Sequence, residues 1–290
     1  MASELHVVTV ATESKYYFPY LLESCRRNNQ DLEILGFGEK WQGFVWRYTK
    51  IIEYLHTLPC NDIVCIIDGY DVICTRDLHE LMPVFISMKN KYKCKVVVGQ
   101  ENVASYVNLL SQYFYFGKCN GRSLNAGTYI GYVCDLLEII PKICKLNTTQ
   151  SEDDQIIMTK YCNVHPDEIY IDTNNELFLT IVDNLNDLDN HVHIENRILS
   201  YNNNRPFFIH AAYYGYLDKI IPQLGYSYAD NIKDQLYADF TKNKIMVYLQ
   251  MAISQNIYFI LFLGGLVIIC LRMKYFRTHY IYYGRKRKVL

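Results

Sequence analysis

The sequence predicts an α/β protein with a doubly wound sheet, followed by an apolar segment and a basic tail. Continuous apolar runs such as residues 63–67 (IVCII) and 95–99 (KVVVG) have the length and β-branched composition of strands buried on both faces. Segments with a helical spacing of apolar residues separate these runs, and this alternation is typical of doubly wound sheets. The 290 residues suffice for one large domain with an appendage, so we expect a single functional site.

The predicted elements follow one another in order along the chain. In the first part, strands are expected at residues 6–12, 32–35, 62–68 and 95–99, and helices at residues 14–29, 46–57 and 78–88. In the second part, strands are expected at residues 123–133, 168–172, 178–186 and 206–210, and helices at residues 135–145 and 151–161. Residues 101–121 are left unassigned.

Charge is distributed unevenly. Seven of the 29 basic residues lie behind residue 271, where there is no acidic residue, so the rest of the chain has a net charge of -8. An acidic domain is poorly suited to binding a phosphate backbone, and we therefore expect no nucleic-acid partner.

Ten cysteines occur without a C-x-x-C pair, which argues against a zinc or redox motif. Cys65 and Cys74 lie within apolar runs, as reduced core cysteines do. We expect most of the ten to be buried thiols, and the sequence leaves open whether one or two disulfides form.

A membrane anchor is predicted near the carboxyl end. Residues 257–271 are 15 positions without a charge, and a basic segment follows them. A bilayer span needs about 20 apolar residues, but diluted apolar residues upstream and the basic flank fit a span. The predicted organisation is a main domain at 1–235, a linker at 236–256, a transmembrane helix at 257–272 and a basic tail at 273–290. The alternative for the apolar segment is a buried core helix.

The sequence gives conflicting indications about the side of the membrane. Residues 1–10 have the pattern of a strand rather than of a secretory signal, which favours a single-pass carboxyl-terminal anchor with a cytosolic main domain. The basic residues behind the anchor, however, prefer the cytosolic side themselves. Asn147-Thr148-Thr149 is a glycosylation sequon that matters only if the domain is luminal.

A candidate metal site follows the strand at 62–68. The segment Asp68-Gly69-Tyr70-Asp71 places two carboxylates where a buried parallel strand ends, and open α/β sheets bind ligands at such edges. Asp68, Asp71 and a distant histidine such as His210 form a ligand set suited to Mn²⁺ or Mg²⁺. The alternative is a polar turn that ends a strand, which is the commoner meaning of an isolated D-x-x-D.

Six segments occur together in one order: HVVTVATES, LGFGEKWQG, IIDGYDVI, LNAGTYIGY, EDDQ and the apolar run that ends in His210. Over about residues 5–215 this order resembles the glycosyltransferase domain of procollagen lysyl hydroxylases and of related collagen galactosyl- and glucosyltransferases. The resemblance implies a GT-A fold, a Rossmann-like mixed sheet flanked by helices. It also implies Mn²⁺, a UDP-glucose or UDP-galactose donor, and an acceptor hydroxylysine or galactosyl-hydroxylysine in a collagen-like protein.

The resemblance also implies residues for the donor. Thr9 and Thr12 would contact the uridine, Trp41 lies in the donor-side loop, and Tyr70 would stack on or bond the nucleotide. Lys50 matches a lysine that reaches a phosphate. The alternatives are a plain core strand for the threonines, a strand-end aromatic for Tyr70 and a solvated helix face for Lys50.

Residues near the reacting sugar are implied in the same way. Asn125 and Gly127 match a segment that faces the donor and acceptor sugars, and Gly127 would leave space for them. Asp153 and Asp154 resemble paired acids, one of which accepts the proton of the acceptor hydroxyl or stabilises positive charge at the anomeric carbon. His210 is the third metal ligand by resemblance. The alternatives are helix-terminal acids and a structural histidine.

Two departures bear on the acceptor and the phosphates. Residues 102–110 contain no tryptophan where the family has a tryptophan-rich loop, and Ala-Ala-Tyr-Tyr follows His210 in place of a glycine-containing sequence. Other hypotheses are a catalytically inactive glycan- or nucleotide-sugar-binding module displayed on a membrane, and a structural membrane protein. The Asn, Ile and Tyr content also suggests an AT-rich genome, such as that of a large DNA virus.

Overall fold

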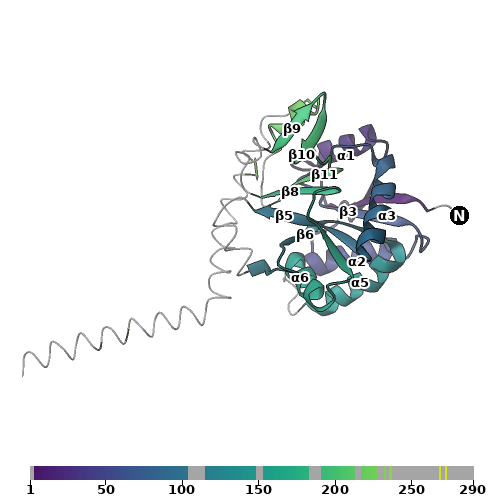
Figure 1. The fold of residues 1–290 in the computed structure, drawn as a ribbon, viewed down its shortest axis with the longest axis vertical. Coiled ribbons are helices and arrows are strands. Elements are labelled where there is room, and N and C mark those ends of the chain that lie inside the picture. Colours follow the sequence, from purple (N-terminus) through teal and green to yellow (C-terminus); the bar gives the residue numbers. More distant parts are fainter. Residues whose placement is uncertain are drawn as a thin grey trace, which may run out of the picture. The chain divides into compact units, whose positions relative to one another are not determined.

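The computed structural model describes residues 3–103, 115–147, 153–182, 191–212 and 217–227, together with residues 232, 235, 236, 268 and 272. The chain divides into two compact units, Met1–Tyr237 and Ala238–Leu290. Nearly all described residues belong to the first unit, which contains every element named below (Figure 1).

The first unit is built on a mixed nine-stranded sheet, as the described residues define it. Its strands are β1 (Leu5–Val10), β2 (Leu32–Leu35), β3 (Ile63–Ile67), β4 (Val72–Cys74), β5 (Val96–Val103), β6 (Leu124–Tyr132), β7 (Ile169–Asp172), β8 (Phe178–Val182) and β11 (Phe208–Ala212). Their order is β2-β1-β3-β6-β5-β8-β11-β4, with β7 paired to β5. The expected mixed α/β sheet is therefore present.

The sheet contains both parallel and antiparallel pairs. Strand β1 is parallel to β2 and β3, whereas β6 is antiparallel to both β3 and β5. Strand β11 is parallel to β8 and antiparallel to β4. The register of β5 against β6 shifts between Val98 and Gly99, and β5 changes partner from β7 to β8 at this point. A side chain at Gly99 would place its Cβ 2.4 Å from Thr128 Oγ1, so glycine permits the close approach.

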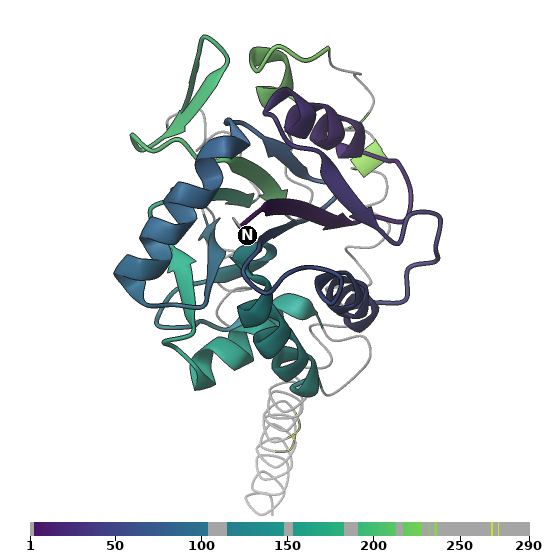
Figure 2. The ribbon, with the colours of Figure 1, turned by 90° about the vertical axis from the view of Figure 1, so that its right-hand side faces the viewer.

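Helices cover both faces of the sheet (Figure 2). They are α1 (Phe18–Arg27), α2 (Phe44–Leu55), the 3-10 turn η1 (Leu78–Glu80), α3 (Leu81–Tyr92), α5 (Val133–Lys145), α6 (Asp154–Val164) and α8 (Ile220–Gln223). Helices α2, α5 and α6 pack on the face that carries Val64 and Ile66, and α1 and α3 pack on the face that carries Cys65 and Ile67. Every residue of β3 is buried, which explains why its sequence is a continuous apolar run.

Several short elements were not predicted from the sequence. Strand β4 has only three residues, too few for a recognisable period. Strands β9 (Val192–Glu195) and β10 (Ile198–Tyr201) form a separate hairpin (Figure 1), and Leu199 of β10 belongs to the same apolar cluster as Tyr20 of α1. The first helix begins at Phe18 rather than residue 14, with a proline in its first turn, where a missing amide hydrogen costs nothing.

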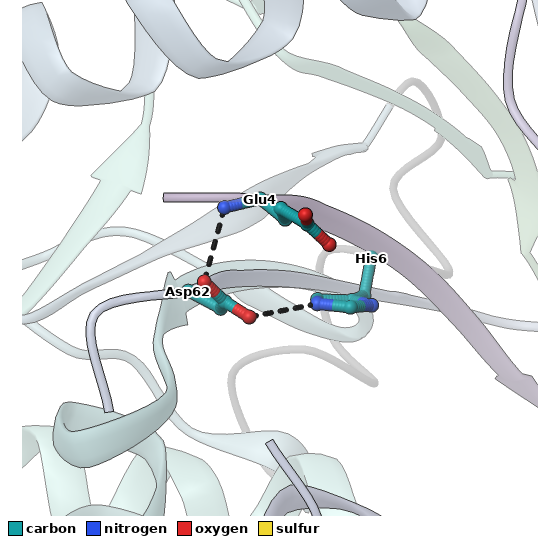
Figure 3. A group of neighbouring side chains, drawn as sticks. All are labelled: Glu4, His6 and Asp62. Carbon is teal, nitrogen blue, oxygen red and sulfur yellow. Dashed lines mark hydrogen bonds and ion pairs between the residues drawn. The ribbon is translucent and has the colours of Figure 1, made fainter. Parts of the chain in front are cut away.

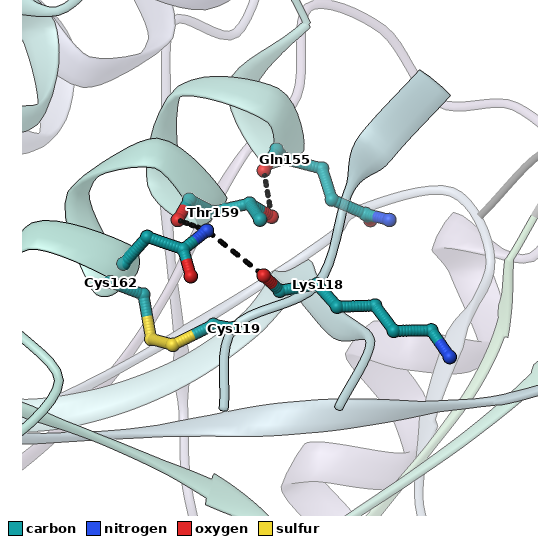
Figure 4. The surroundings of a disulfide bond; sticks show 6 residues. Lys118, Cys119, Gln155, Thr159 and Cys162 are labelled. Carbon is teal, nitrogen blue, oxygen red and sulfur yellow. Dashed lines mark hydrogen bonds between the residues drawn. A yellow bond between two sulfur atoms is a disulfide. The ribbon is translucent and has the colours of Figure 1, made fainter. Parts of the chain in front are cut away.

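Two disulfides answer the question that the sequence left open. Cys60 pairs with Cys134 across 74 residues, and Cys119 pairs with Cys162 across 43 residues. The second joins the loop before β6 to α6, where Asn163 also donates a hydrogen bond to the Lys118 carbonyl at 2.9 Å (Figure 4). The cysteines within apolar runs, Cys65 and Cys74, are buried free thiols as expected.

Within the described residues, no helix combines the length and apolarity that crossing a bilayer requires. The predicted transmembrane helix at 257–272 lies outside the described residues except for Ile268 and Arg272. The linker at 236–256, apart from Leu236, and the tail at 273–290 also lie outside them.

The turn between β7 and β8 depends on one buried carboxylate. Asp172 is fully buried and accepts hydrogen bonds from the backbone amides of Glu176 (3.0 Å), Leu177 (2.7 Å) and Phe178 (3.0 Å). This turn sets the start of β8, which in turn pairs with β11. The carboxylate therefore helps to position the strand that carries His210.

We expect Asp172→Ala to lower the free energy of unfolding by about 3 kcal/mol, because it leaves two buried amide donors and one partly buried donor without an acceptor. Chemical denaturation followed by circular dichroism measures the change. Asp167→Ala, at an exposed position in the loop before β7, is the matched control. Equal unfolding midpoints for the two variants would show that the turn does not need the carboxylate.

Candidate functional site

Two carboxylates and one imidazole converge where β3 ends. Asp68 follows β3, Asp71 precedes β4, and His210 lies in β11, which pairs antiparallel with β4 so that His210 is opposite Val72. His210 Nε2 lies 3.2 Å from Asp71 Oδ2 and 3.5 Å from Asp68 Oδ2. One ligand atom from each residue lies within 4.8 Å of the others, a spacing that could hold a metal ion.

The orientation of His210 is fixed by Asn125 on β6. The Asn125 side-chain oxygen accepts a hydrogen bond from the Gly127 amide at 3.0 Å, which identifies it as the acceptor. It lies 3.0 Å from His210 Nδ1, so Nδ1 carries the hydrogen and donates it. Nε2 then points at two carboxylates without a hydrogen-bond partner among the described residues. A cation between these groups would satisfy all three, so the residues present fit a divalent metal.

Protonation of His210 is the other way to satisfy these groups. Burial of the imidazole lowers its pKa, but the carboxylates of Asp71 and Asp68 outweigh this effect and raise the pKa above its ordinary value. A divalent cation would take the place of that proton.

A buried polar chain extends behind Asn125. Its side-chain nitrogen lies 3.3 Å from Gln155 Oε1, and Gln155 Nε2 donates to Glu101 Oε2 at 3.0 Å. Burial raises the pKa of Glu101 to about 8, with Gln155 opposing the shift. The Asn125 oxygen thus contacts His210 and its nitrogen contacts Gln155, and the residue does not line the cleft described below. That Asn125 faces the donor and acceptor sugars stays a prediction of the sequence.

Gly127 lies against the same group of ligands. A Cβ at this position would lie 2.4 Å from Asp68 Oδ2 and 2.5 Å from His210 Cε1. Its expected role is to leave space for sugars, and the space that it leaves is beside two of the candidate metal ligands, Asp68 and His210.

Arg47, which the sequence analysis missed, connects Asp68 to the acidic pair on α6. Its guanidinium is buried, with Nη2 2.7 Å from Asp68 Oδ1 and Nη1 2.6 Å from Asp154 Oδ2. Burial raises the pKa of Asp68 to about 6 and also raises that of Asp154, while Arg47 opposes both shifts. A sequence signal existed, because Arg47, Ile51 and Leu55 recur every four residues and share the buried face of α2.

Asp153 and Asp154 differ in their surroundings. Asp153 is the N-cap of α6, and its carboxylate accepts a hydrogen bond from the Gln155 amide at 2.9 Å. Burial and the neighbouring Asp154 raise the pKa of Asp153 to about 7. Both predicted acids thus lie at the amino end of α6, and Asp154 lines the cleft described next.

A cleft of about 770 Å³ opens beside the two aspartates. Its lining includes Thr12, Lys15, Lys40, Trp41, Phe44, Arg47, Asp68, Tyr70, Asp71 and Asp154. Of the residues predicted to contact the donor, Thr12, Trp41 and Tyr70 line it.

The other predicted donor residues lie elsewhere. Thr9 is fully buried in β1 beneath Gly69 and does not line the cleft. Lys50 lies 2.7 Å from Glu39 and 3.8 Å from Glu53 and does not line the cleft either. The lysines that do line it are Lys15 and Lys40.

The residues of the cleft are braced by aromatic contacts. The Tyr70 hydroxyl accepts a hydrogen bond from the Thr12 amide at 2.9 Å, which ties the end of β1 to the metal-ligand segment. Trp41, 44% exposed, meets Phe44 and Trp46 edge to face at centroid distances of 5.7 and 5.5 Å. An exposed indole beside a cleft offers a flat apolar surface to a ring-shaped ligand.

A second group of potential ligands lies where β1 and β3 begin (Figure 3). Here Asp62 accepts a hydrogen bond from the Glu4 amide at 3.0 Å, and its second oxygen lies 3.1 Å from His6 Nε2. These contacts already use both carboxylate oxygens, so Asp62 ties the two strand starts together.

Comparison with known protein families covers the part of the chain that forms the site. A family model described as the PLOD GT domain matches residues 1–213, most of the chain and all residues of the site. The chain belongs to this family. As a PLOD GT domain it is 26% identical over 175 residues to a multifunctional procollagen lysine hydroxylase and glycosyltransferase of Caenorhabditis elegans, covering 57% of this chain and 23% of that protein.

A human relative, procollagen-lysine,2-oxoglutarate 5-dioxygenase 2, is 26% identical over 169 residues, covering 54% of this chain and 22% of its own length. This PLOD GT domain thus spans less than a quarter of the curated relatives it matches. Among solved structures, a glycosyltransferase involved in glycosylation of the PBCV-1 major capsid aligns over 72% of this chain and 94% of its own, with a TM-score of 0.47 and 13% identity. The bifunctional glycosyltransferase WbbM aligns over 82% of this chain and 52% of its own, with a TM-score of 0.46 and 14% identity.

We expect Gly127→Ala to weaken Mn²⁺ binding by about 100-fold or more, because the added methyl group would displace Asp68 and His210 from a shared ion. Isothermal titration calorimetry measures the affinity. Gly131→Ala is the matched control on the same strand, because its added Cβ would meet only apolar atoms of Leu136 and Val96 at 3.1 Å or more. Undiminished Mn²⁺ binding by Gly127→Ala would place the metal elsewhere.

Proposed function

We propose that this PLOD GT domain is a metal-dependent glycosyltransferase of the GT-A type. It would transfer glucose or galactose from a UDP-sugar to a hydroxyl group of a collagen-like protein, on hydroxylysine or galactosyl-hydroxylysine. The observation that carries the proposal is the convergence of Asp68, Asp71 and His210 beside a large cleft. Membership of the family supports the activity, and the names of the relatives, which include procollagen lysine hydroxylase, support a collagen-like acceptor.

The ligand set supports Mn²⁺, with Mg²⁺ as the alternative. Two carboxylates suit either cation, and an imidazole nitrogen is tolerated better by Mn²⁺. When bound, the cation would offset the charge of the donor diphosphate and of the departing UDP.

The cleft offers separate groups to the two ends of a UDP moiety. Trp41 and Tyr70 provide aromatic surfaces for the uridine, and Thr12 provides a hydroxyl beside them. Lys15 and Lys40 are the lysines in position to approach phosphates, and Lys50 stays a prediction of the sequence. Thr9 supports this wall from within β1.

The acidic pair supports a division of labour in the reaction. The acceptor oxygen forms a bond to the anomeric carbon, the bond from that carbon to the phosphate oxygen breaks, and UDP leaves. The acceptor hydroxyl loses its proton, and Asp153 is the proposed recipient: it does not line the cleft itself but adjoins Asp154, which does, and burial raises its pKa to about 7. Asp154, ion-paired with Arg47, is better suited to stabilise positive charge at the anomeric carbon.

We expect Asp71→Ala to lower Mn²⁺-dependent UDP release from UDP-glucose or UDP-galactose by about 100-fold or more, because one of three ligands is lost. A coupled UDP assay, with and without Mn²⁺ and with hydroxylysine peptides as acceptors, measures the rate. Asp31→Ala, whose side chain is 89% exposed, is the matched control.

Two outcomes of this assay would contradict the proposal. If the wild-type protein binds Mn²⁺ and UDP-sugars but releases no UDP with either donor, it is an inactive sugar-nucleotide-binding module. If Asp71→Ala keeps the wild-type rate, the reaction does not use this metal group.

We also propose that residues 257–272 anchor the protein in a membrane, with this domain on the non-cytosolic side. The two disulfides support an oxidising compartment for the domain. The basic residues behind the apolar segment support a cytosolic tail. The two arguments agree, and they favour the luminal alternative over the cytosolic one.

We expect the thiols of Cys60, Cys134, Cys119 and Cys162 to resist alkylation in protein isolated from eukaryotic cells until a reductant is added. Mass spectrometry of tryptic peptides measures this protection. Cys144, a partly buried free thiol, is the internal control and should be alkylated on unfolding without reduction. Complete alkylation of all four cysteines without reductant would contradict the luminal placement.

A further inference from the structure

The charged guanidinium of Arg47 is buried close to the proposed metal ligands. A buried guanidinium is costly unless it is paired, and Arg47 is paired twice, with Asp68 and with Asp154. These partners come from different parts of the chain, since Asp68 follows β3 and Asp154 begins α6. The arginine therefore joins three elements at one point.

The two oxygens of Asp68 have different neighbours. Oδ1 lies 2.7 Å from Arg47, whereas Oδ2 lies 3.5 Å from His210 Nε2 and so faces the other metal ligands. With one oxygen held by the guanidinium, the other is left to a cation. Arg47 thus sets which face of the carboxylate a metal meets.

No other described lysine or arginine lies within ion-pair distance of Asp68 or Asp154. Lys15, which also lines the cleft, is paired with Glu13 at 2.9 Å. A lysine at position 47 would carry a point charge on a flexible stem, whereas the planar guanidinium presents two nitrogens to two carboxylates at once. The pairing geometry is specific to arginine.

We propose that Arg47 is a positioning residue that couples the metal group to Asp154. It orients Asp68 for the cation and, through its other nitrogen, holds Asp154 beside the cleft. The coupling to Asp154 rests on the proposed function, whereas the effect on the cation does not.

The test compares Arg47→Met, Arg47→Lys and Asp154→Asn with the control Arg26→Met, which removes the same charge from a side chain that is 72% exposed. Mn²⁺ affinity is measured by calorimetry, and kcat and KM for the donor by UDP release. Arg47→Met should weaken Mn²⁺ binding by about 10-fold, as loss of a group that orients a ligand does. It should also lower kcat at saturating Mn²⁺ and donor by about 100-fold, with a smaller change in KM, as loss of positioning at the reacting centre does.

The remaining variants test separately the contact of Arg47 with Asp68 and its contact with Asp154. Arg47→Lys should keep Mn²⁺ affinity within about threefold, because the positive charge is retained. It should still lower kcat, because a single ammonium group cannot hold Asp68 and Asp154 at once as the planar guanidinium does. In the Asp154→Asn background, Arg47→Met should lower kcat by less than about threefold further, since the pair acts as a unit.

Two results would overturn the inference: Mn²⁺ affinity and kcat in Arg47→Met equal to those of Arg26→Met, or fully additive effects of Arg47→Met and Asp154→Asn on kcat. If Arg47→Met does not fold, the split between affinity and kcat in Arg47→Lys decides the matter. If the wild-type protein releases no UDP, the proposed function fails, but the Mn²⁺ titrations still test whether Arg47 orients Asp68.

Discussion

Like charges gathered beneath the cleft set the main physical constraint on this protein. Asp68, Asp71 and Asp154 line the same cleft; Asp154 is buried, whereas the side chains of Asp68 and Asp71 are 32% and 25% exposed, and burial raises the pKa of Asp68 and Asp154. Positive charge must accompany them for the fold to be stable with these groups ionised. Arg47 supplies one such charge, and a proton on His210 or a divalent cation supplies the rest.

The surrounding structure holds these charged groups in one arrangement. Asn125 holds His210 with Nε2 toward the carboxylates, and Gly127 leaves the space between them free. Cys119–Cys162 joins the loop before β6 to α6, the helix that carries Asp154 and Gln155. The disulfide thus ties together two elements that contribute to the candidate site.

Membership of the PLOD GT domain family and the geometry answer different questions. The family match covers residues 1–213 and accounts for the order of the motifs. The geometry divides the predicted residues into three groups: the three candidate metal ligands, those along the cleft, and those that support either. Asn125 and Thr9 belong to the supporting group. Arg47, which is in none of the sequence motifs, is paired with the candidate ligand Asp68.

The sequence by itself determined the alternation of strands and helices, the two aspartates at the end of β3 and the acidic start of α6. These features depend on residues that are near one another in the chain, where apolar period and helix-cap preference act directly. The hairpin of β9 and β10 and the three-residue β4 escaped prediction because short strands carry little period of their own.

Only the tertiary structure decided which distant side chains meet. It set the disulfide partners, the tautomer of His210, the separation of Lys50 from the cleft and the two ion pairs of Arg47. These features depend on strand order and helix packing between segments that are distant in the chain, and on how far burial changes the cost of a charge. Neither the contacts between distant elements nor the cost of burying a charge can be read from local sequence, because both arise only when the helices pack on the sheet.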